Sequence, residues 1–236
     1  MCLTCAEAQT KAAADSAYAA EKYDEAIKLY SGLLKEGTNA DIYYNLGNCY
    51  YKTDHIAHAI LNYERAFLLE PSDADIRFNL ELARTKTVDK IIPESEMFFI
   101  TWFKSLVNIM SMDAWACTGV VAFVLTCILA FIFYFSNRVL MRKIGFFGAA
   151  AMFILVVLSN VFAWRQHVAQ NSRTGAVVMV TSVVVKSTPN ESGTDLFVLH
   201  EGTRVEIIDA SMKDWKEIRL ADGKVGWMPA QSIEVI

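Results

Sequence analysis

Two uncharged apolar runs constrain the fold of this chain more than any other feature of its sequence. Residues 115–135 and residues 144–164 are each 21 residues long and contain no Asp, Glu, Lys or Arg. At about 1.5 Å per residue, a helix of this length reaches roughly 32 Å, which covers a bilayer core of about 30 Å. Two buried helices of a soluble core are the alternative, but uncharged apolar runs of about 18 residues already indicate membrane spans. We therefore predict a hairpin of two transmembrane helices, with residues 115–135 as the first and residues 144–164 as the second.

A short cationic connector separates the two runs. This connector, residues 136–143, contains Arg138, Arg142 and Lys143. Short loops rich in Lys and Arg remain in the cytoplasm. The connector is therefore predicted to be a basic cytoplasmic loop, and its three cations are the predicted determinants of topology. Both soluble parts of this multi-pass protein would then lie in the periplasm, on the outer side of a bacterial inner (cytoplasmic) membrane.

Charge is distributed unevenly along the chain. Residues 1–96 have a net charge of −6, residues 97–173 of +5 and residues 174–236 of −3, which together give the −4 of the whole chain. Two acidic soluble parts therefore flank a basic membrane part. Because nucleic acids bind to basic soluble surfaces, we expect the membrane and other proteins as partners and no nucleic acid.

The sequence contains no pattern that indicates catalysis. The four histidines are scattered, and neither a Gly-rich phosphate loop nor a nucleophile elbow is present. His55 and His58 have no third ligand nearby in the sequence, so no metal site is expected there. We therefore expect a protein that is not an enzyme and that has no catalytic residues, metal or cofactor.

The first residues have features of a processed signal peptide. Ala6-Glu7-Ala8 before Gln9 has the small-x-small form of a cleavage site, and the topology above requires export of the N-terminal part. Residues 1–8 are therefore expected to be the remnant of a signal peptide. The Ala-rich start of a helix is the alternative, and a lipid-modified Cys5 is a weaker one. The five cysteines have no spacing that predicts disulfides.

An internal repeat organises residues 9–92. The segment ADIYYNLGNCYY begins at Ala40 and the segment ADIRFNLELART begins at Ala74, which gives a period of 34 residues. This period, with small and aromatic residues at fixed positions, resembles the tetratricopeptide repeat (TPR), a pair of packed helices. Gly47 and Ala59 are expected where the two helices approach closely. We predict an all-α helical repeat domain of about two and a half repeats, because one repeat alone cannot bury its apolar face.

The face opposite the packing stripe of these helices is the predicted binding groove. Its residues follow helical spacing from the first repeat into the second: Asp41, Tyr44, Asn45, Asn48, Lys52, Phe78 and Asn79. Asparagine amides both donate and accept hydrogen bonds, which suits binding to an extended peptide backbone. The alternative is that these are ordinary solvated residues.

Residues 94–112 form an amphipathic segment before the first span. Apolar side chains recur at helical spacing on one face of it, from Phe98 to Met110. This pattern predicts an amphipathic helix that lies in the membrane interface. A helix packed on the repeat domain is the alternative.

Residues 174–236 have the pattern of a small all-β domain. Short β-type runs are separated by turn signals such as Glu201-Gly202 and Asp222-Gly223. The order VVVKSTPNESG, LHEGTRVEII and DWKEIRLADGKVGWMP resembles a bacterial SH3-like barrel. The resemblance implies binding to cell-wall peptides or to proteins. The predicted surface consists of Trp215, Trp227 and Pro229, with Trp227 in the core as the alternative.

The order of repeats, two spans and SH3-like barrel resembles the BatE family encoded in bacterial aerotolerance operons. The segments YYNLGNCYY, AILNYERAFLLEPSDADIRFNLELAR and GKVGWMP carry this resemblance, which extends over nearly the whole chain. It implies an inner-membrane complex that supports tolerance to oxidative stress. Its implied partners are von Willebrand factor A-domain membrane proteins and a MoxR-type ATPase system.

Three functions are compatible with these patterns. The first is a membrane-anchored protein-interaction adaptor whose TPR groove binds a partner peptide or helix. The second is a cell-wall sensor whose SH3-like domain binds peptidoglycan peptides. The third is an assembly scaffold without a peptide ligand.

Overall fold

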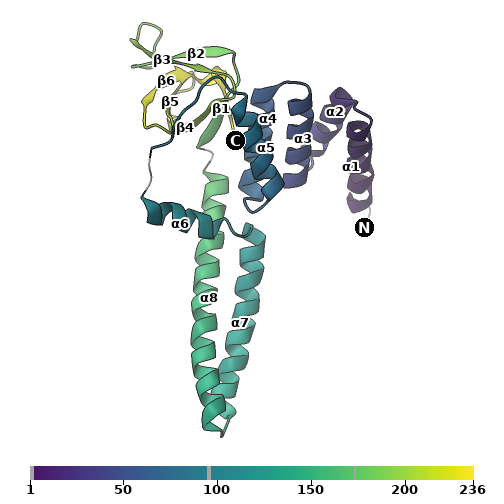
Figure 1. The fold of residues 1–236 in the computed structure, drawn as a ribbon, viewed down its shortest axis with the longest axis vertical. Helices are drawn as coiled ribbons and strands as arrows, with labels where there is room; N and C mark the ends of the chain where they lie inside the picture. Colours follow the sequence, from purple (N-terminus) through teal and green to yellow (C-terminus); the bar gives the residue numbers. More distant parts are fainter. Residues whose placement is uncertain (1–2, 95–96, 173) are drawn as a thin grey trace. The chain divides into compact units, whose positions relative to one another are not determined.

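The structure is a computed structural model that describes residues 3–94, 97–172 and 174–236, with side chains described from Lys11 onward. The chain divides into two compact units. One unit combines residues 1–97 with residues 172–236, and the other contains residues 98–171. The predicted fold class is confirmed: the described residues form eight α-helices and one antiparallel seven-stranded sheet (Figure 1). Residues 1 and 2 of the expected signal-peptide remnant lie outside the described residues, and helix α1 begins at Leu3.

Five helices form the repeat domain. They are α1 (Leu3–Ala19), α2 (Tyr23–Leu33), α3 (Ala40–Lys52), α4 (Ile56–Leu69) and α5 (Ala74–Thr85). Helices α3 and α5 begin at the two residues that start the repeated sequence segments, because each is preceded by a capping side chain. Asn39 Oδ1 accepts from the amide of Ile42 at 3.2 Å, and Asp73 Oδ1 accepts from the amide of Ile76 at 3.1 Å.

Small residues allow α3 and α4 to pack closely. A Cβ atom added to Gly47 would lie 2.7 Å from the ring of Tyr63, and Ala59 is completely buried. The Tyr63 ring is fixed by its own burial and by a hydrogen bond from its hydroxyl to Asn48 Oδ1 at 2.7 Å. The close approach that the repeat pattern predicts at Gly47 and Ala59 is therefore present.

The C-terminal part of this unit is a twisted antiparallel sheet. Its strands are β1 (Gly175–Val178), β2 (Ser182–Lys186), β3 (Asp195–His200), β4 (Arg204–Asp209), β5 (Trp215–Arg219), β6 (Val225–Pro229) and β7 (Ile233–Val235). Their order in the sheet is β3-β2-β6-β5-β4-β1-β7. Buried residues such as Val185, Ile218 and Met228 form the core. Gly202 has a φ of +82°, a conformation that glycine adopts without steric cost, and it forms the turn before β4.

The sheet covers the last complete repeat. Val177 of β1 shares one buried cluster with Ile60 and Leu61 of α4, and Met179 and Ile236 pack against this cluster. Helical repeats require a terminal element that covers the apolar face of the last unit. The SH3-like domain supplies part of that cover here.

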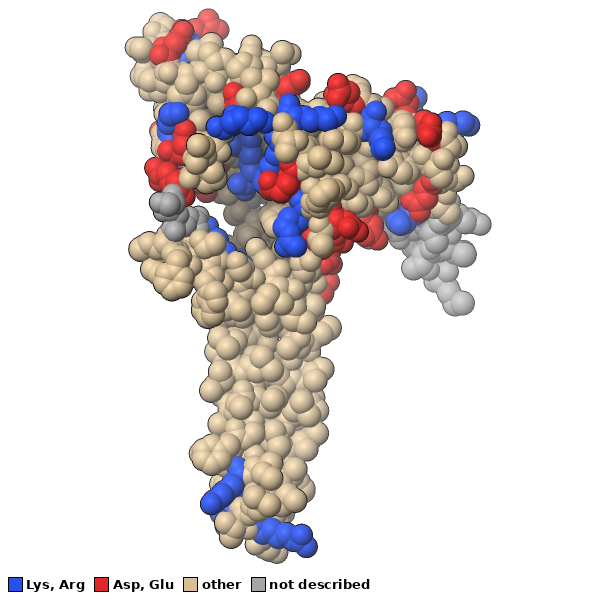
Figure 2. All heavy atoms as spheres, viewed as in Figure 1, with Lys and Arg blue, Asp and Glu red and all other residues tan. Residues whose placement is uncertain are grey.

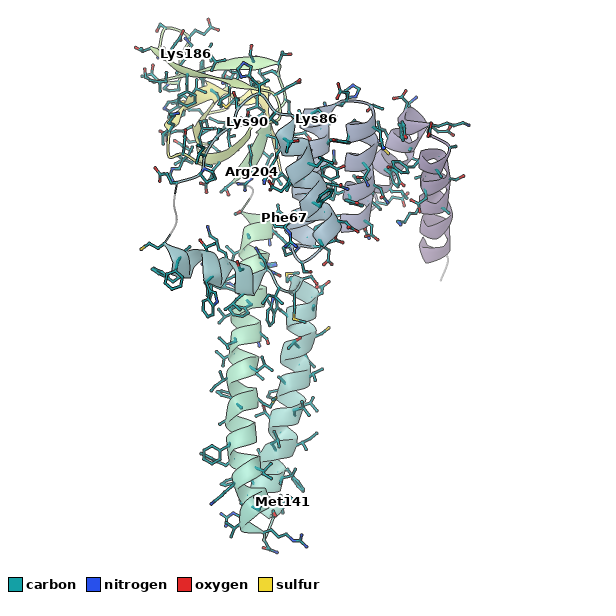
Figure 3. The ribbon with its side chains drawn as sticks, viewed as in Figure 1. Phe67, Lys86, Lys90, Met141, Lys186 and Arg204 are labelled. Carbon is teal, nitrogen blue, oxygen red and sulfur yellow. The ribbon has the colours of Figure 1, made fainter. Side chains whose placement is uncertain are left out.

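Polar contacts from the segment after α5 join the repeats to the sheet. The Asp89 carboxylate accepts from the amide of His200 at 2.7 Å, from His200 Nδ1 at 2.8 Å and from Thr203 Oγ1 at 2.6 Å. Lys90 holds the start of this segment in place, because its ammonium group donates to the carbonyl groups of Thr85 and Thr87 at 2.8 Å (Figure 3). We call the contacts of Asp89 with His200 and Thr203 the Asp89 junction.

A buried carboxylate makes a second polar contact between repeats and sheet. Glu64 of α4 is only 4% exposed. Its Oε1 atom lies 2.5 Å from Arg84 Nη2 of α5 and 3.4 Å from Arg204 Nε of β4 (Figure 3). Removing either arginine would leave the buried carboxylate with one cationic partner fewer, which would lower the stability of the fold.

Acid is expected to weaken the Asp89 junction. Burial alone would raise the pKa of the Asp89 carboxyl, but hydrogen bonds from Thr203 and His200 outweigh burial and hold this pKa below its ordinary value. The carboxylate therefore stabilises the fold above its unfolded-state pKa of about 3.9, and this contribution is lost as the pH falls through the lower folded-state pKa. The free energy of unfolding, measured between pH 7 and pH 3, should fall less in Asp89→Asn than in the unsubstituted protein. Equal decreases would contradict this assignment.

The second unit contains two long apolar helices that lie side by side as an antiparallel hairpin (Figure 1). Helices α7 (Met112–Phe135) and α8 (Val139–Asn171) are both long and apolar enough to cross a membrane. The face shown in Figure 2 is free of charged side chains along most of the hairpin and has cations at the connector end. The backbones approach closely at Gly145, where an added Cβ would lie 2.7 Å from the backbone nitrogen of Phe133. Small residues at such crossings are typical of helix pairs in membranes.

The connector of the hairpin is shorter than the predicted loop of residues 136–143. Only residues 136–138 separate the two helices, and α8 begins at Val139. Of the three predicted topology determinants, only Arg138 lies in the connector, whereas Arg142 and Lys143 lie in the first turns of α8. No Gly or Pro follows Arg138 until Gly145, so helix formation can begin early. The cations still gather at one end of the hairpin.

A short helix, α6 (Phe98–Val107), precedes the hairpin and is anchored to it. Gln166 Nε2 of α8 donates to the carbonyl groups of Val107 at 2.7 Å and Met110 at 2.8 Å. Trp115 Nε1 of α7 donates to the carbonyl group of Val107 at 2.9 Å. The apolar face predicted for residues 94–112 is divided: its C-terminal part packs on the hairpin, whereas Phe98 and Trp102 are exposed. A location of this helix in the membrane interface stays a prediction, and residues 95 and 96 of the segment are not described.

Candidate protein-interaction surfaces

Three of the predicted groove residues meet in one hydrogen-bonded cluster between α3 and α5. Asn79 Nδ2 donates to the Tyr44 hydroxyl at 2.7 Å and to Asn48 Oδ1 at 3.2 Å. Asn48 Oδ1 also accepts from Tyr63, which links the cluster to the buried α3–α4 interface. We call Tyr44, Asn48 and Asn79 the amide cluster. Its side chains are half-buried, so the cluster is held in one arrangement while part of it remains accessible.

The amide cluster leaves a donor and an acceptor for a ligand. Both hydrogens of the Asn79 amide are used within the cluster, and among the hydrogen bonds of the described residues none reaches Asn79 Oδ1. The Tyr44 hydroxyl accepts from Asn79 and keeps its own hydrogen to donate. One acceptor next to one donor matches the N–H and C=O groups of a peptide backbone.

The remaining predicted groove residues differ from the amide cluster in their chemistry. Phe78 is 67% exposed on α5. Asp41 and Lys52 are exposed near opposite ends of α3, and Asn45 is half-buried between them. Protein-binding surfaces commonly combine aromatic side chains with polar groups. The seven predicted residues therefore comprise the three members of the amide cluster, a fourth polar residue (Asn45), one aromatic side chain and two charges of opposite sign.

The predicted SH3-like residues lie on one outward face of strands β5 and β6. Trp215 is directly opposite Pro229, and Glu217 is directly opposite Trp227. Directly opposed residues of an antiparallel pair point to the same face. Met228, which points the other way, is completely buried, whereas Trp227 is half-buried. Trp227 therefore lies outside the sheet core, beside the other two surface residues.

Strand β2 adds a charged side chain to the same face. Lys186 pairs with Trp227 in the sheet register, and its ammonium group lies 2.8 Å from the carboxylate of Asp195. We call Trp215, Trp227 and Pro229, together with Lys186 and Glu217, the β5–β6 face. Two indole rings beside mixed charges can pack on apolar or sugar-bearing ligands and can pair with ionic groups.

The residues that join repeats to sheet were missed by the sequence patterns. Asp89 lies in an irregular stretch after α5, and its partners His200 and Thr203 are more than 100 residues away, so no local signal indicates it. Glu64 had a detectable signal. It lies one helical turn after Ile60, on the apolar face of α4, where a charged residue must find a partner.

Comparison with known protein families identifies the two soluble modules. The tetratricopeptide repeat family matches residues 40–73, which contain α3 and α4. The bacterial SH3 domain family matches residues 181–234, which contain β2 to β6 and most of β7. No curated protein matches the chain.

The fold and these two matches define a class of protein. Tetratricopeptide repeats are protein-interaction modules, and bacterial SH3 domains bind peptidoglycan or proteins; neither module is usually catalytic. The chain thus combines two binding modules in one unit with a pair of helices suited to a membrane.

Proposed function

We propose that this chain is a membrane-anchored adaptor that binds a partner protein through its TPR groove. The amide cluster carries the proposal, because it offers a fixed acceptor on Asn79 and a fixed donor on Tyr44 to an extended peptide. Phe78, the residue before Asn79, is exposed and adds an aromatic side chain. Rigid polar groups lose little conformational entropy on binding, which favours affinity. The ligand is an extended segment or helix of the partner with an apolar side chain for Phe78.

We further propose that the hairpin anchors the adaptor in the inner membrane with both soluble domains in the periplasm. One observation supports an even number of crossings between residues 97 and 172. The repeats and the SH3-like domain share a buried core and the Asp89 junction, so both must lie on the same side of a membrane. The cations at the connector end support the cytoplasm as the other side.

The resemblance to the BatE family supports a choice of partner. The adaptor would belong to an inner-membrane complex linked to aerotolerance, together with von Willebrand factor A-domain membrane proteins and a MoxR-type ATPase system. The A-domain proteins are the proposed direct partners, because they share the membrane with the adaptor.

The test is co-purification of the full chain with these A-domain proteins. The variant Asn79→Ala with Phe78→Ala removes the free acceptor of the amide cluster and the exposed ring, but leaves the Asn48–Tyr63 hydrogen bond intact, so the repeats should stay folded. We expect this groove variant to bind the A-domain proteins at least tenfold more weakly. Residues at the centre of an interface contribute about 1.4 kcal/mol or more to the free energy of binding, and 1.4 kcal/mol corresponds to a tenfold change in affinity. The control Val88→Ala with Asn190→Ala removes a similarly exposed apolar side chain, 66% exposed, and an exposed amide outside the groove. Equal recovery from groove and control variants would favour an assembly scaffold without a peptide ligand.

A second function, a cell-wall sensor, is favoured by the shared orientation of Trp215, Trp227 and Pro229. In that case the full chain in detergent would co-sediment with purified peptidoglycan. Trp215→Ala would reduce the co-sedimented fraction, whereas the groove variant would not. If the full chain did not co-sediment with peptidoglycan, the sensor function would be excluded, whereas the adaptor proposal would be unaffected.

A further inference from the structure

A cavity lies at the connector end of the hairpin, in the unit of residues 98–171. Its volume is about 310 Å³, and it is lined by Phe133, Val139, Arg142, Lys143, Phe146 and Phe147. Helix α7 contributes Phe133, and α8 contributes the other five residues. Met141, next to Arg142 in sequence, marks this end of the hairpin in Figure 3.

The walls of the cavity combine aromatic rings with two cations. The rings of Phe133 and Phe146 are 5.7 Å apart, and the Arg142 guanidinium carbon lies 5.6 Å from the centre of the Phe133 ring. Stacking on the ring holds the guanidinium beside the apolar wall. Positive charge and an apolar surface therefore occur together in a single cavity.

The cations of this cavity lack a carboxylate partner in their own unit. Residues 98–171 contain five Lys and Arg residues but only one acidic residue, Asp113. Asp113 lies in the first turn of α7, about 30 Å from Phe133 at a rise of about 1.5 Å per residue. A charge that neutralises Arg142 and Lys143 must therefore come from outside this unit.

One class of ligand supplies both a negative charge for the two cations and apolar groups for the aromatic walls. An anionic phospholipid carries a phosphate group that can pair with cations, and glycerol and acyl groups that can contact phenylalanine rings. Basic pockets at the ends of membrane helices bind such headgroups. We infer that this cavity binds the headgroup region of an anionic phospholipid. A free phosphate ion would meet the cations but would leave the aromatic walls uncovered. The inference rests on the membrane location of the hairpin given under the proposed function, and does not depend on any partner protein.

The experiment measures lipid retained by the full chain in neutral detergent micelles, using native mass spectrometry. Phosphatidylglycerol and phosphatidylcholine are added separately. We expect preferential retention of phosphatidylglycerol and a loss of about 30-fold in its apparent affinity in Arg142→Gln with Lys143→Gln, since each cation near anionic headgroups contributes about fivefold. The control Arg138→Gln with Arg165→Gln removes the same charge without altering the cavity lining, and should change the affinity by less than about threefold.

A variant of the aromatic wall and a competition experiment complete the test. Phe146→Ala with Phe147→Ala leaves the charge unchanged and should still weaken the binding of phosphatidylglycerol. Inorganic phosphate at millimolar concentration should not displace the bound phosphatidylglycerol. Circular dichroism checks that all variants keep their helices. Equal retention of both lipids, equal losses in lining and control variants, or full displacement by phosphate would overturn the inference. Co-purification of the A-domain proteins is a separate readout, so failure of the adaptor proposal would be distinguishable.

Discussion

Replacing Asp89 with alanine is expected to lower the free energy of unfolding of the repeat and SH3-like unit by about 3–5 kcal/mol. The carboxylate accepts hydrogen bonds from the His200 amide, from His200 Nδ1 and from Thr203 Oγ1, all at 2.8 Å or less. A hydrogen bond to a charged group contributes about 1.5–3 kcal/mol, and a buried donor left without an acceptor adds a cost. Thr203 is buried, so water cannot easily replace the lost carboxylate.

Two measurements test this expectation on the full chain in detergent. Chemical denaturation gives the loss of stability, and amide hydrogen exchange locates it. The His200 amide should exchange much faster in Asp89→Ala, because its acceptor is gone. The control Asp222→Ala removes a carboxylate that interacts with Lys224 in its own turn, with the amide at 3.2 Å and the ammonium group at 2.8 Å. This substitution should cost less than about 1 kcal/mol. Unchanged exchange at His200 in Asp89→Ala would show that Asp89 does not hold the junction.

Replacing Gly145 with leucine is expected to separate the two apolar helices and to destabilise the hairpin by about 3 kcal/mol. The first added carbon would already lie 2.7 Å from the backbone nitrogen of Phe133 and 2.8 Å from the carbonyl oxygen of Leu129. Backbone atoms cannot rotate away as a side chain can, so the helices must move apart. Overpacking of this kind costs about 1–3 kcal/mol even when flexible side chains can adjust.

The thermal midpoint of the hairpin, followed by circular dichroism in a fixed detergent, measures this effect. Ala150→Leu is the matched control, because Ala150 is on the same helix but is exposed. It adds the same side chain without meeting α7 and should leave the midpoint nearly unchanged. Similar decreases in both variants would indicate that Gly145 is not a contact point between the helices.

Local patterns predicted the elements of this fold well. The period of 34 residues located the starts of α3 and α5, because the repeat places a capping residue, Asn39 or Asp73, directly before each helix. The two uncharged runs predicted α7 and α8 for a similar reason, since length and apolarity are properties of the segment itself. The start of α8 was less predictable, because Arg142 and Lys143 are equally compatible with a loop and with a helix.

Contacts between distant segments could not be predicted from these patterns. The sequence places Asn79 on the same face as Tyr44, but the hydrogen bonds of the amide cluster depend on how α5 packs on α3. The packing of the SH3-like sheet on α4 depends on shape complementarity between segments separated by both apolar helices. Neither hydrophobic periodicity nor turn chemistry specifies such a pairing.

Segments before and after the apolar hairpin form one folded unit, which affects how this protein is made. A ribosome completes α4 long before it synthesises β1. Ile60 and Leu61 therefore stay without the cover of Val177 and Ile236 until those residues have been synthesised. Under the proposed function, transfer of the two apolar helices into a membrane would fall within this interval. A product truncated after α8 would therefore retain an uncovered apolar patch, which chaperones and proteases recognise in unfinished proteins. Synthesis of β1 and Ile236 thus completes the cover of this core.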